Sequence, residues 1–541
     1  MMRTAVRERD RMREKERMRR LFLIIVVCAI FCFMAAFYVR AAVLNYGMEG
    51  DEVFSYISAS SLGGYKGICY LEDQTWYEGS YFRDALTAEG EERFNYKMVV
   101  ENQAMDTHPP FYYLLLNVVV SFFPGQFSRW FGIGLNIFLM FLVWAGLYLL
   151  LQHFLHRRYM AAFFSTLFCC SYLSVSLVLF IRMYVLLTAV ALFQTWYHLK
   201  LYDEMKKEAV FSGRSHLKSY MFLALLTFLG AWTHYYFIIY QCLLSFFFCA
   251  ALLWQRKYSD VLRYSGTLAV SALIYVFLYP ASLNHLFFKY RGRDAVHKLL
   301  KGSSLTGEVW EMFRLYNREL YHGMFLILAG ILSLITLALI IKGKMRWKAI
   351  GKGVFLMAPL GIYFFVISKA SPFVTLRYIA PVSPVLFAAT VVWIFHLLKR
   401  LNICQRAGRV LIIGICLVFI PITVYWWERP IKYDFFAEKR DVIFELADET
   451  DFCVYVTGDE YNWKMWEDYI YYPLFEGLYF IDGTEKKPIS DSRLISQDSL
   501  TIFIDSALDE DEILDYIGEY LPYQSCELVY TAQYHSIYLV Q

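Results

Sequence analysis

The sequence has 541 residues, of which 58% are hydrophobic and 19% aromatic, and its mean hydropathy is +0.39. This composition excludes an ordinary soluble domain, because charged residues make up 19% here against about 25% in such domains. The net charge of +3 hides a segregation: residues 428–541 hold 25 acids and 8 bases, a net charge of −17, so the remainder carries about +20. Such asymmetry indicates a membrane protein or an interaction tail, and we expect no nucleic-acid partner.

The chain begins with a basic segment, residues 1–20, that precedes an apolar run. Arg17, Arg19 and Arg20 lie directly before Leu21–Phe37. This run is longer than the apolar region of a signal peptide, and no small-residue cleavage site follows it closely. We therefore predict an uncleaved membrane anchor with a cytoplasmic N-terminus.

Apolar segments of a length that can cross a bilayer recur along most of the chain. A crossing helix needs about 20 mainly apolar residues. The eleven segments that qualify are 21–44, 128–152, 159–181, 183–199, 219–234, 235–254, 263–283, 323–342, 349–368, 378–397 and 409–427. The sequence thus predicts an α-helical polytopic membrane protein in which residues 21–427 form the transmembrane domain, with the plasma membrane as its location and membrane lipid around it.

One apolar segment, Phe111–Phe123, is too short to cross comfortably and is predicted to be an interfacial or re-entrant helix. If it does not cross, the loops on the cytoplasmic side are all basic, as the positive-inside rule requires. These loops contain His156 to Arg158, Lys200 to Lys218, Arg256 to Arg263, Lys342 to Lys348 and Lys399 to Arg409. With eleven spans and a cytoplasmic N-terminus, residues 45–127, 283–322 and 428–541 are predicted to lie outside. The first of these loops is long enough to hold helices of its own.

The tail, residues 428–541, has the pattern of a small extracytoplasmic α/β domain. Branched and aromatic residues favour strands, and amphipathic spacing favours helices. The predicted strands are Cys453–Val456, Leu478–Ile481, Leu500–Ile504 and Leu528–Tyr530, and the predicted helices are Trp463–Phe475 and Asp509–Tyr520. The sequence has no glycine-rich phosphate loop there, which favours a recognition or packing domain over a second enzyme.

The 11 cysteines show no metal-binding spacing, and most of them lie inside apolar runs. Cys453 and Cys526 both fall in the tail, where an oxidising compartment would allow them to pair. Strand cysteines are also often simply packed, so the sequence leaves both alternatives open.

Two groups of polar residues lie in the first outer loop, close to the predicted membrane. Asp51 and Glu52 follow the first span, and Asp106-Thr107-His108-Pro109-Pro110 precedes the short apolar segment. Paired carboxylates can bind a cation or act as a base, although a solvated loop explains the first pair as well. Proline suits the first turn of a helix, but a plain helix start does not account for Asp106 and His108.

Further polar and aromatic residues are predicted at the outer ends of other spans. Charged groups near a membrane are costly, so they tend to be paired or functional, although each one alone is also typical of an interfacial anchor. The candidates are Arg182, Tyr184, His234, Tyr235, Lys369, Arg377 and Tyr378. Their convergence on one side of the membrane predicts a shared site.

In this order, the motifs resemble those of bacterial glycosyltransferase family 39 proteins. That family belongs to the GT-C superfamily, with protein O-mannosyltransferases and lipid A aminoarabinose transferases. The resemblance spans about residues 20–430, and its motifs are Asp51-Glu52, Asp106 to Leu116, Arg182-Met183-Tyr184, His234-Tyr235-Tyr236, and Arg377-Tyr378 with Pro381 and Pro384. Asp-x-His-Pro-Pro is the most specific of these motifs, and the tail lies outside the resemblance.

The resemblance implies a GT-C fold, a polyprenyl-phosphate sugar donor and inverting transfer on the outer face. It suggests Asp51 as the base. We expect Arg182 and Arg377 to bind the phosphate, and Glu52, Asp106 and His108 to hold acceptor, sugar or a metal. The sequence leaves open the sugar, the acceptor (protein, glycan or lipid) and whether Mg²⁺ or Mn²⁺ takes part. The alternatives are a transporter or lipid flippase, and a receptor or scaffold.

Overall fold

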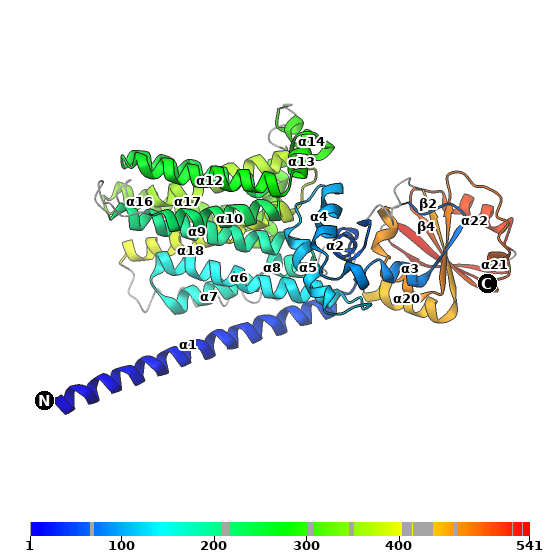
Figure 1. Ribbon diagram of the computed structural model, residues 1–541, viewed down its shortest axis with the longest axis horizontal. Helices are drawn as coiled ribbons and strands as arrows, with labels where there is room; N and C mark the ends of the chain where they lie inside the picture. Colours follow the sequence, from blue (N-terminus) through cyan, green and yellow to red (C-terminus); the bar gives the residue numbers. More distant parts are fainter. Residues whose placement is uncertain are drawn as a thin grey trace.

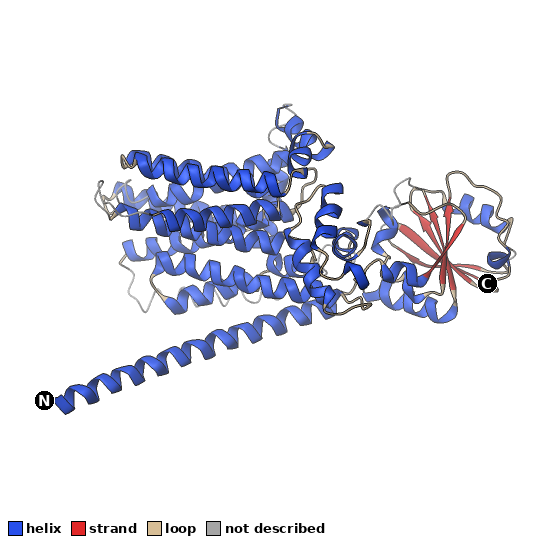
Figure 2. Ribbon diagram, in the orientation of Figure 1, coloured by secondary structure: helices blue, strands red, loops and turns tan. Residues whose placement is uncertain are grey.

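The structure is a computed structural model that describes residues 2–64, 70–207, 216–300, 307–345, 351–402, 414, 437–458, 463–521, 523–532 and 534–541. It has a helical bundle and, at one end of the bundle, a lobe built around a β-sheet (Figures 1 and 2). The N-terminus lies at the opposite end, because α1 (Met2–Leu44) extends along the outside of the bundle. The short helices of the first loop lie between the bundle and the lobe (Figure 1).

Over the described residues, the bundle helices overlap the predicted spans, although several ends differ by a few residues and one span is divided. They are α1, α6 (Arg129–Leu155), α7 (Arg158–Cys169), α8 (Tyr172–Leu179), α9 (Tyr184–Lys206), α10 (Leu217–Thr233), α11 (Tyr236–Trp254), α12 (Tyr258–Leu278), α16 (Phe325–Ile341), α17 (Gly351–Ala370) and α18 (Ser383–Arg400). The predicted span 409–427 lies outside the described residues except for Gly414. By length and apolar composition alone, five described helices can cross a membrane, or up to seven if each bent pair is one span. The molecule is therefore a multi-pass membrane protein.

The segment 159–181 is not the single continuous span that its apolar run predicts. It is divided into α7 and α8, which meet at an angle of 60°. Ser171 lies at the break, where its side chain accepts a hydrogen bond from the backbone N–H of Ser174 and caps α8. A serine that bonds the backbone in this way favours a new helix start over a continuous helix.

The first loop contains four helices and no crossing segment among its described residues. These helices are α2 (Gly50–Ser60), α3 (Gly79–Asp84), α4 (Tyr96–Met105) and α5 (Phe111–Ser121). The 11 residues of α5 span only about 16 Å, roughly half the thickness of a bilayer core. The prediction of a short helix between residues 111 and 123 is thus confirmed, and α5 packs against α2, α4 and α6.

The lobe has a six-stranded sheet in the order β1-β3-β2-β4-β6-β5. The strands are β1 (Thr75–Glu78), β2 (Phe452–Thr457), β3 (Gly477–Asp482), β4 (Leu500–Asp505), β5 (Cys526–Thr531) and β6 (His535–Val540). The four predicted strands are confirmed, and so is the second predicted helix, as α22 (Glu510–Gly518) with Asp509 at its N-cap. The predicted helix 463–475 is instead two short 3₁₀ turns, η6 (Trp463–Glu467) and η7 (Tyr472–Leu474).

Strand β1 belongs to the first loop, not to the tail, and is visible as the blue strand of the lobe (Figure 1). It pairs antiparallel with β3, so that Thr75 lies opposite Phe480. The Trp76 indole N–H donates to Asp491 over 3.0 Å, and Asp73 accepts from the backbone N–H of Asp482 over 2.8 Å. The first loop therefore completes the sheet of the tail.

Cys453 and Cys526 do not form the disulfide that the sequence left open, because both thiols are free. Cys453 lies in β2 and Cys526 in β5, with β4 and β6 between these two strands. Three strand spacings correspond to about 14 Å, about twice the Cα separation that a disulfide can bridge. The buried Cys453 is a packed strand residue.

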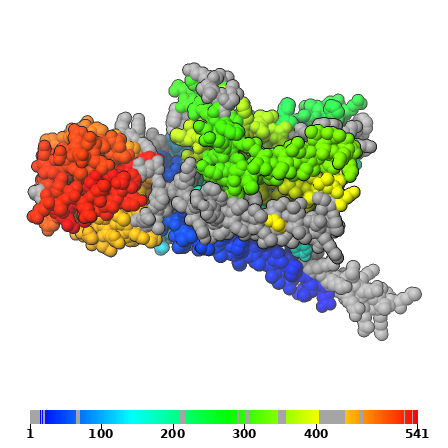
Figure 3. Space-filling view, turned by 180° about the vertical axis from the view of Figure 1, so that it is seen from behind, coloured from blue at the N-terminus to red at the C-terminus, as the bar shows by residue number. Residues whose placement is uncertain are grey.

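Aromatic side chains join the first loop to the tail. The Phe54 ring of α2 stacks on Trp466 of η6, with 4.3 Å between the ring centroids. Phe82 of α3 is fully buried against Tyr469 and Tyr472, at 5.2 and 5.1 Å. In the space-filling view the tail forms a lobe of its own at one end of the molecule (Figure 3). These contacts hold that lobe against the loop that carries the candidate site.

We expect Phe82→Ala to destabilise the lobe by about 3–5 kcal/mol, because it removes a buried aromatic ring and leaves a cavity. Urea unfolding of the detergent-solubilised protein, followed by hydrogen exchange in the strands of the lobe, measures this effect. Tyr70→Ala is the matched control, since Tyr70 lies in the same loop and is 62% exposed. Equal unfolding of both variants would contradict the packing described here.

Candidate active site

Helix α2 begins with a carboxylate arrangement that fixes its position. One oxygen of Glu52 accepts a hydrogen bond from the backbone N–H of Glu49 over 2.8 Å, and the other accepts from the backbone N–H of Ile181 over 2.9 Å. Glu52 is only 1% exposed, and burial raises its pKa to about 7. Its two oxygens therefore attach the start of α2 to the connection between α8 and α9, which is a different task from the substrate contact expected of it.

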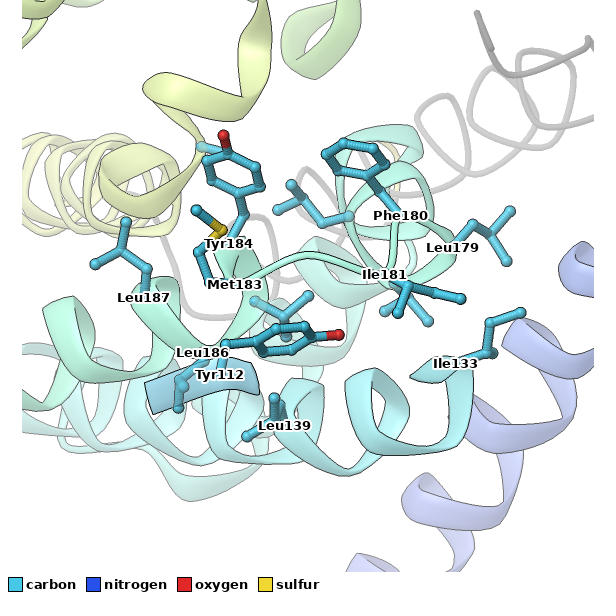
Figure 4. Packing of buried hydrophobic residues seen from close by; sticks show 14 of the residues in the cluster. Tyr112, Ile133, Leu139, Leu179, Phe180, Ile181, Met183, Tyr184, Leu186 and Leu187 are labelled. Atoms are coloured by element: carbon cyan, nitrogen blue, oxygen red, sulfur yellow. The ribbon is translucent and has the colours of Figure 1, made fainter. Parts of the chain in front are cut away.

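The α8–α9 connection is itself tightly packed (Figure 4). Asn136 of α6 donates to the carbonyls of Val178 and Phe180 over 3.1 and 2.9 Å, and it accepts from the Tyr112 hydroxyl over 3.0 Å. Gly132 allows this close approach, because a Cβ there would lie 2.3 Å from the Ile181 side chain. The backbone that carries Arg182 is thus held in one conformation.

Arg182 and Arg377 converge on Asp51 from two separate parts of the chain. The guanidinium of Arg377, in η4 (Leu376–Tyr378), lies 2.6 Å from one Asp51 oxygen. The guanidinium of Arg182 lies 3.5 Å from the other oxygen and also donates to the Asp51 backbone carbonyl over 3.1 Å. The side chains of Arg182 and Arg377 are 4% and 14% exposed, and that of Asp51 is 33% exposed. The cluster therefore has one face open to solvent.

The charges of this cluster do not cancel. Burial would raise the pKa of Asp51, but Arg182 and Arg377 outweigh it and lower the pKa to about 2, so the carboxylate stays ionised. Burial and the neighbouring Asp51 raise the pKa of Glu49, which lies 3.8 Å from Arg377, well above its usual range. With Glu49 protonated, two guanidiniums face one carboxylate. This cluster is then positive by itself, and the ionised Asp106 beside Arg182 offsets that charge. The two guanidiniums still have N–H donors suited to an anionic ligand.

Asp106 and His108 form a second pair beside the cluster. The Nδ1 of His108 lies 2.8 Å from an Asp106 oxygen. Burial lowers the pKa of His108 despite Asp106, which leaves the ring neutral at pH 7, and His108 keeps the pKa of Asp106 low. Because the carboxylate can only accept, Nδ1 carries the proton and Nε2 has a free lone pair. The Asp51 and Arg182 charges also act on His108, so the two groups share one site.

Aromatic rings line the site next to these charges. Tyr184 lies 5.8 Å from His234 and 6.4 Å from Tyr378, and His234 lies 6.1 Å from His108, all between ring centroids. Tyr235 points elsewhere, since its hydroxyl bonds His285 over 2.7 Å. Lys369 is buried near the end of α17 and is not one of the two cations paired with Asp51. The structure thus brings together most, but not all, of the residues expected from the sequence.

A cavity of about 200 Å³ opens beside Arg377, between α8, η4 and α15 (Gly307–Tyr321). Its lining is mainly apolar and includes Leu173, Leu177, Phe180 and Leu376. The cavity also has two charged side chains in its lining, Arg377 and Glu319, and Glu319 is paired with Arg318. It therefore combines an apolar wall with a guanidinium that can bind the charged group of an amphiphilic anion.

The residues fit a metal ion poorly. Among the described residues, no three His, Cys, Asp or Glu side chains gather as metal ligands. The oxygens of Asp51 face guanidiniums, and those of Glu52 bond backbone N–H groups. The positive charge next to Asp51 comes from Arg182 and Arg377.

Sequence reasoning missed Glu49 and Tyr113 as members of the site. Tyr113 lies under the Arg182 guanidinium, which is 5.9 Å from the ring centroid. Tyr113 belongs to the Asp106-to-Leu116 motif and lies in the first turn of α5 after Pro110. Its place in that motif was therefore a usable signal. Glu49 had the weaker signal of lying two positions before Asp51.

Comparison with solved structures gives the fold. The chain is similar to ArnT from Cupriavidus metallidurans bound to undecaprenyl phosphate, with 13% identity, coverage of 95% of this chain and 98% of that one, and a TM-score of 0.53. The chain has the GT-C fold. Weaker similarities are to the apo state of the same ArnT (13% identity, 90% and 95% coverage, TM-score 0.41) and to the oligosaccharyltransferase AglB from Archaeoglobus fulgidus (10%, 92% and 71%, TM-score 0.44). No protein-family model and no curated protein matches the sequence.

The GT-C fold predicted from the motifs is therefore confirmed, together with its juxtamembrane helices and the small sheet domain at the C-terminus. Because the identity to ArnT is low, the likeness gives the architecture, and the chemistry has to be argued from this chain's own residues.

We expect Asp51→Asn to lower the free energy of unfolding by roughly 1–3 kcal/mol, because two buried guanidiniums lose their counter-charge. The effect is at the lower end of buried pairs, since solvent screens the exposed third of Asp51. Thermal unfolding in detergent at pH 7 measures it.

The pH dependence of this variant has a defined sign. The low pKa of Asp51 contributes stability above its unfolded pKa of about 4, which is lost as the pH falls towards 2. The gap between wild type and Asp51→Asn should therefore close in acid. Glu101→Gln, whose exposed carboxylate pairs with the exposed Lys97 at 3.6 Å, should show no such gap.

Proposed function

We propose that the protein is a membrane glycosyltransferase that moves a sugar from a polyprenyl-phosphate donor to an acceptor on the extracytoplasmic face, with inversion at the anomeric carbon. The observation that carries this proposal is the pair of guanidiniums, Arg182 and Arg377, that meet at Asp51 beside a mainly apolar cavity. In the same proposal residues 21–427 are the catalytic domain and residues 428–541 the outer domain.

The two arginines suit the leaving group of this reaction. A lipid phosphate departs with its negative charge, and guanidiniums donate to phosphate oxygens in a forked geometry. Arg182 is nearly fully buried, and Arg377 lies at the edge of the apolar cavity. The solved ArnT complex, whose fold is similar, contains undecaprenyl phosphate, which supports a ligand of the same chemistry here.

Asp51 is the proposed base. Without donor it is paired with both arginines and has a low pKa. Donor phosphate brings negative charge to the same guanidiniums, which weakens their hold on Asp51 and raises its pKa. The acceptor oxygen then attacks the anomeric carbon as the bond to phosphate breaks, its proton passes to Asp51, and the lipid phosphate leaves paired with Arg182 and Arg377. Asp106 and His108 orient the acceptor or the sugar.

The charge of the loops supports an outer location for the site. The site lies at the end of the bundle that carries the lobe, away from the basic N-terminus (Figure 1). The positive-inside rule places that N-terminus in the cytoplasm. Site and lobe are then both extracytoplasmic, where a polyprenyl-phosphate sugar in the outer leaflet reaches Arg377 from the membrane.

In proteoliposomes supplied with a radiolabelled polyprenyl-phosphate sugar, we expect Asp51→Asn to lower kcat roughly 10²-fold or more, as loss of a general base does. Arg182→Ala and Arg377→Ala should raise the KM for the donor and also lower kcat, because the phosphate charge grows as the bond breaks. Arg83→Ala is the control. Arg83 is an exposed arginine of the first loop, which also carries Asp51, and it pairs with the neighbouring Asp84.

Two results would reject the proposal. Transfer from a soluble nucleotide sugar, with none from the lipid donor, would exclude the lipid-phosphate chemistry. Uptake of a solute or lipid into the vesicles without any covalent product would instead favour the transporter or flippase. Candidate acceptors are identified by mass spectrometry of surface glycans and glycoproteins with and without the protein.

The pH profile separates Asp51 from His108 as the base. If Asp51 is the base, kcat/KM, which reports the free enzyme, should stay flat down to about pH 5, whereas kcat should fall at a higher pH because bound phosphate raises the pKa of Asp51. This acid limb should persist in His108→Gln. Its disappearance in that variant would assign the base role to His108.

A further inference from the structure

The carbonyl end of α4 is held by a side chain from a distant loop. The backbone carbonyls of Ala104, Met105 and Asp106 lie where α4 ends, and a helix cannot satisfy its last carbonyls internally. The ammonium of Lys289 donates to all three, at 3.3 Å for Ala104 and 2.7 Å for Met105, with a shorter contact to Asp106. An ammonium has three donors and also complements the negative end of the helix dipole.

His285, in α13 (Ala281–Phe287), makes a second contact with the same helix end. Its Nε2 lies 3.0 Å from the Ala104 carbonyl, and its Nδ1 lies 2.7 Å from the Tyr235 hydroxyl. A carbonyl only accepts, so Nε2 carries the proton and Nδ1 accepts from Tyr235. Burial lowers the pKa of His285, which agrees with this neutral form. Tyr235 of the His-Tyr-Tyr motif thus supports the end of α4 indirectly, through its hydrogen bond to His285.

The other end of the Asp106–His108 segment is held from the same loop. The Tyr279 hydroxyl donates to the backbone carbonyl of His108 over 3.2 Å, and Tyr279 is only 1% exposed. The hydrogen bonds that residues 279–289 make with residues 104–108 are all to backbone carbonyls. The Asp106 carboxylate and the His108 ring remain available to pair with each other and to face the cluster.

The same loop also reaches the segment that leads to Arg377. Lys298, in α14 (Tyr290–Leu300), donates to the carbonyls of Ser371 and Pro372 over 3.1 and 3.2 Å. The segment α13–α14 projects from the bundle at the end nearest the lobe (Figures 1 and 3). One basic loop therefore contacts the backbone on both sides of the candidate site.

We propose that Lys289, supported by His285 and Tyr279, is a positioning residue that fixes the α4–α5 connection so that Asp106 and His108 face Asp51 and Arg182. This role rests on the proposed glycosyl transfer, in which that pair orients a substrate. A lysine in an outer loop also has the chemistry to bind the donor phosphate directly, but Lys289 would have to leave three backbone carbonyls to do so.

The test is Lys289→Met in the full-length protein, with two readouts. Hydrogen exchange of the amides in residues 106–114 should become faster without any ligand, because the helix end loses its cap. Donor turnover should fall roughly 10–100-fold in kcat with little change in KM, as expected when reacting groups are misplaced by an ångström or less. Lys289→Arg, which keeps the donors and the charge, should restore most of both.

Lys257→Met is the matched control. Lys257 is a buried lysine whose ammonium donates to the Met205 carbonyl near the end of α9, as Lys289 does at α4, but Lys257 lies outside the candidate site. It should leave exchange in residues 106–114 and the kinetics unchanged. If Lys289→Met does not fold, Tyr279→Phe removes a single hydroxyl and should still accelerate exchange next to His108.

The outcomes separate the positioning role from the proposed function. Normal exchange with a donor KM raised more than about tenfold would show that Lys289 binds phosphate and would overturn the proposal. Normal exchange with normal kinetics would overturn it as well. Faster exchange in a protein whose wild type shows no transfer would support the loop's hold on α4 while rejecting the glycosyltransferase itself.

Discussion

The pairing of one carboxylate with two buried guanidiniums is the interaction on which the site depends. Asp51, Arg182 and Arg377 come from the first loop, from the α8–α9 connection and from the segment after α17. A buried guanidinium without a counter-charge is costly, so each arginine needs the first loop to be folded against the bundle. The ion pairs thereby couple the assembly of the bundle to the position of the carboxylate proposed as the base.

The same arrangement explains how such a site can be both stable and ready for an anion. Asp51 balances only part of the arginine charge, and protonated Glu49 adds none. A phosphate would compete with Asp51 for the same guanidiniums and raise the pKa of Asp51, so that in the proposed reaction binding of the donor itself prepares the base. A metal ion would have to compete with the guanidiniums for the same carboxylate, which is why the arginines are the better account of this site.

Sequence patterns predicted the elements well and their long-range contacts poorly. The length of the apolar segments predicted most of the bundle helices, although not the break within 159–181. The prolines and the charge of the loops predicted the short helix α5, because these signals are local. The pairing of β1 with β3 joins residues about 400 positions apart, and a four-residue strand has no pattern of its own. Likewise, Glu52 beside Asp51 looked like a second catalytic carboxylate, and only the fold shows that backbone N–H groups occupy both its oxygens.

Two separate supports hold the segments that carry the candidate residues. The lobe holds the first, since Phe54 stacks on Trp466 one turn after Asp51 in α2, and β1 ties the loop into the sheet. The segment α13–α14, with Lys289 between its two helices, holds the other through the end of α4. Reacting groups must lie within about half an ångström of the productive geometry. A site carried by loops therefore needs supporting contacts. The acidic lobe therefore has a structural role even without a ligand of its own, because its contacts restrain the loop that carries Asp51.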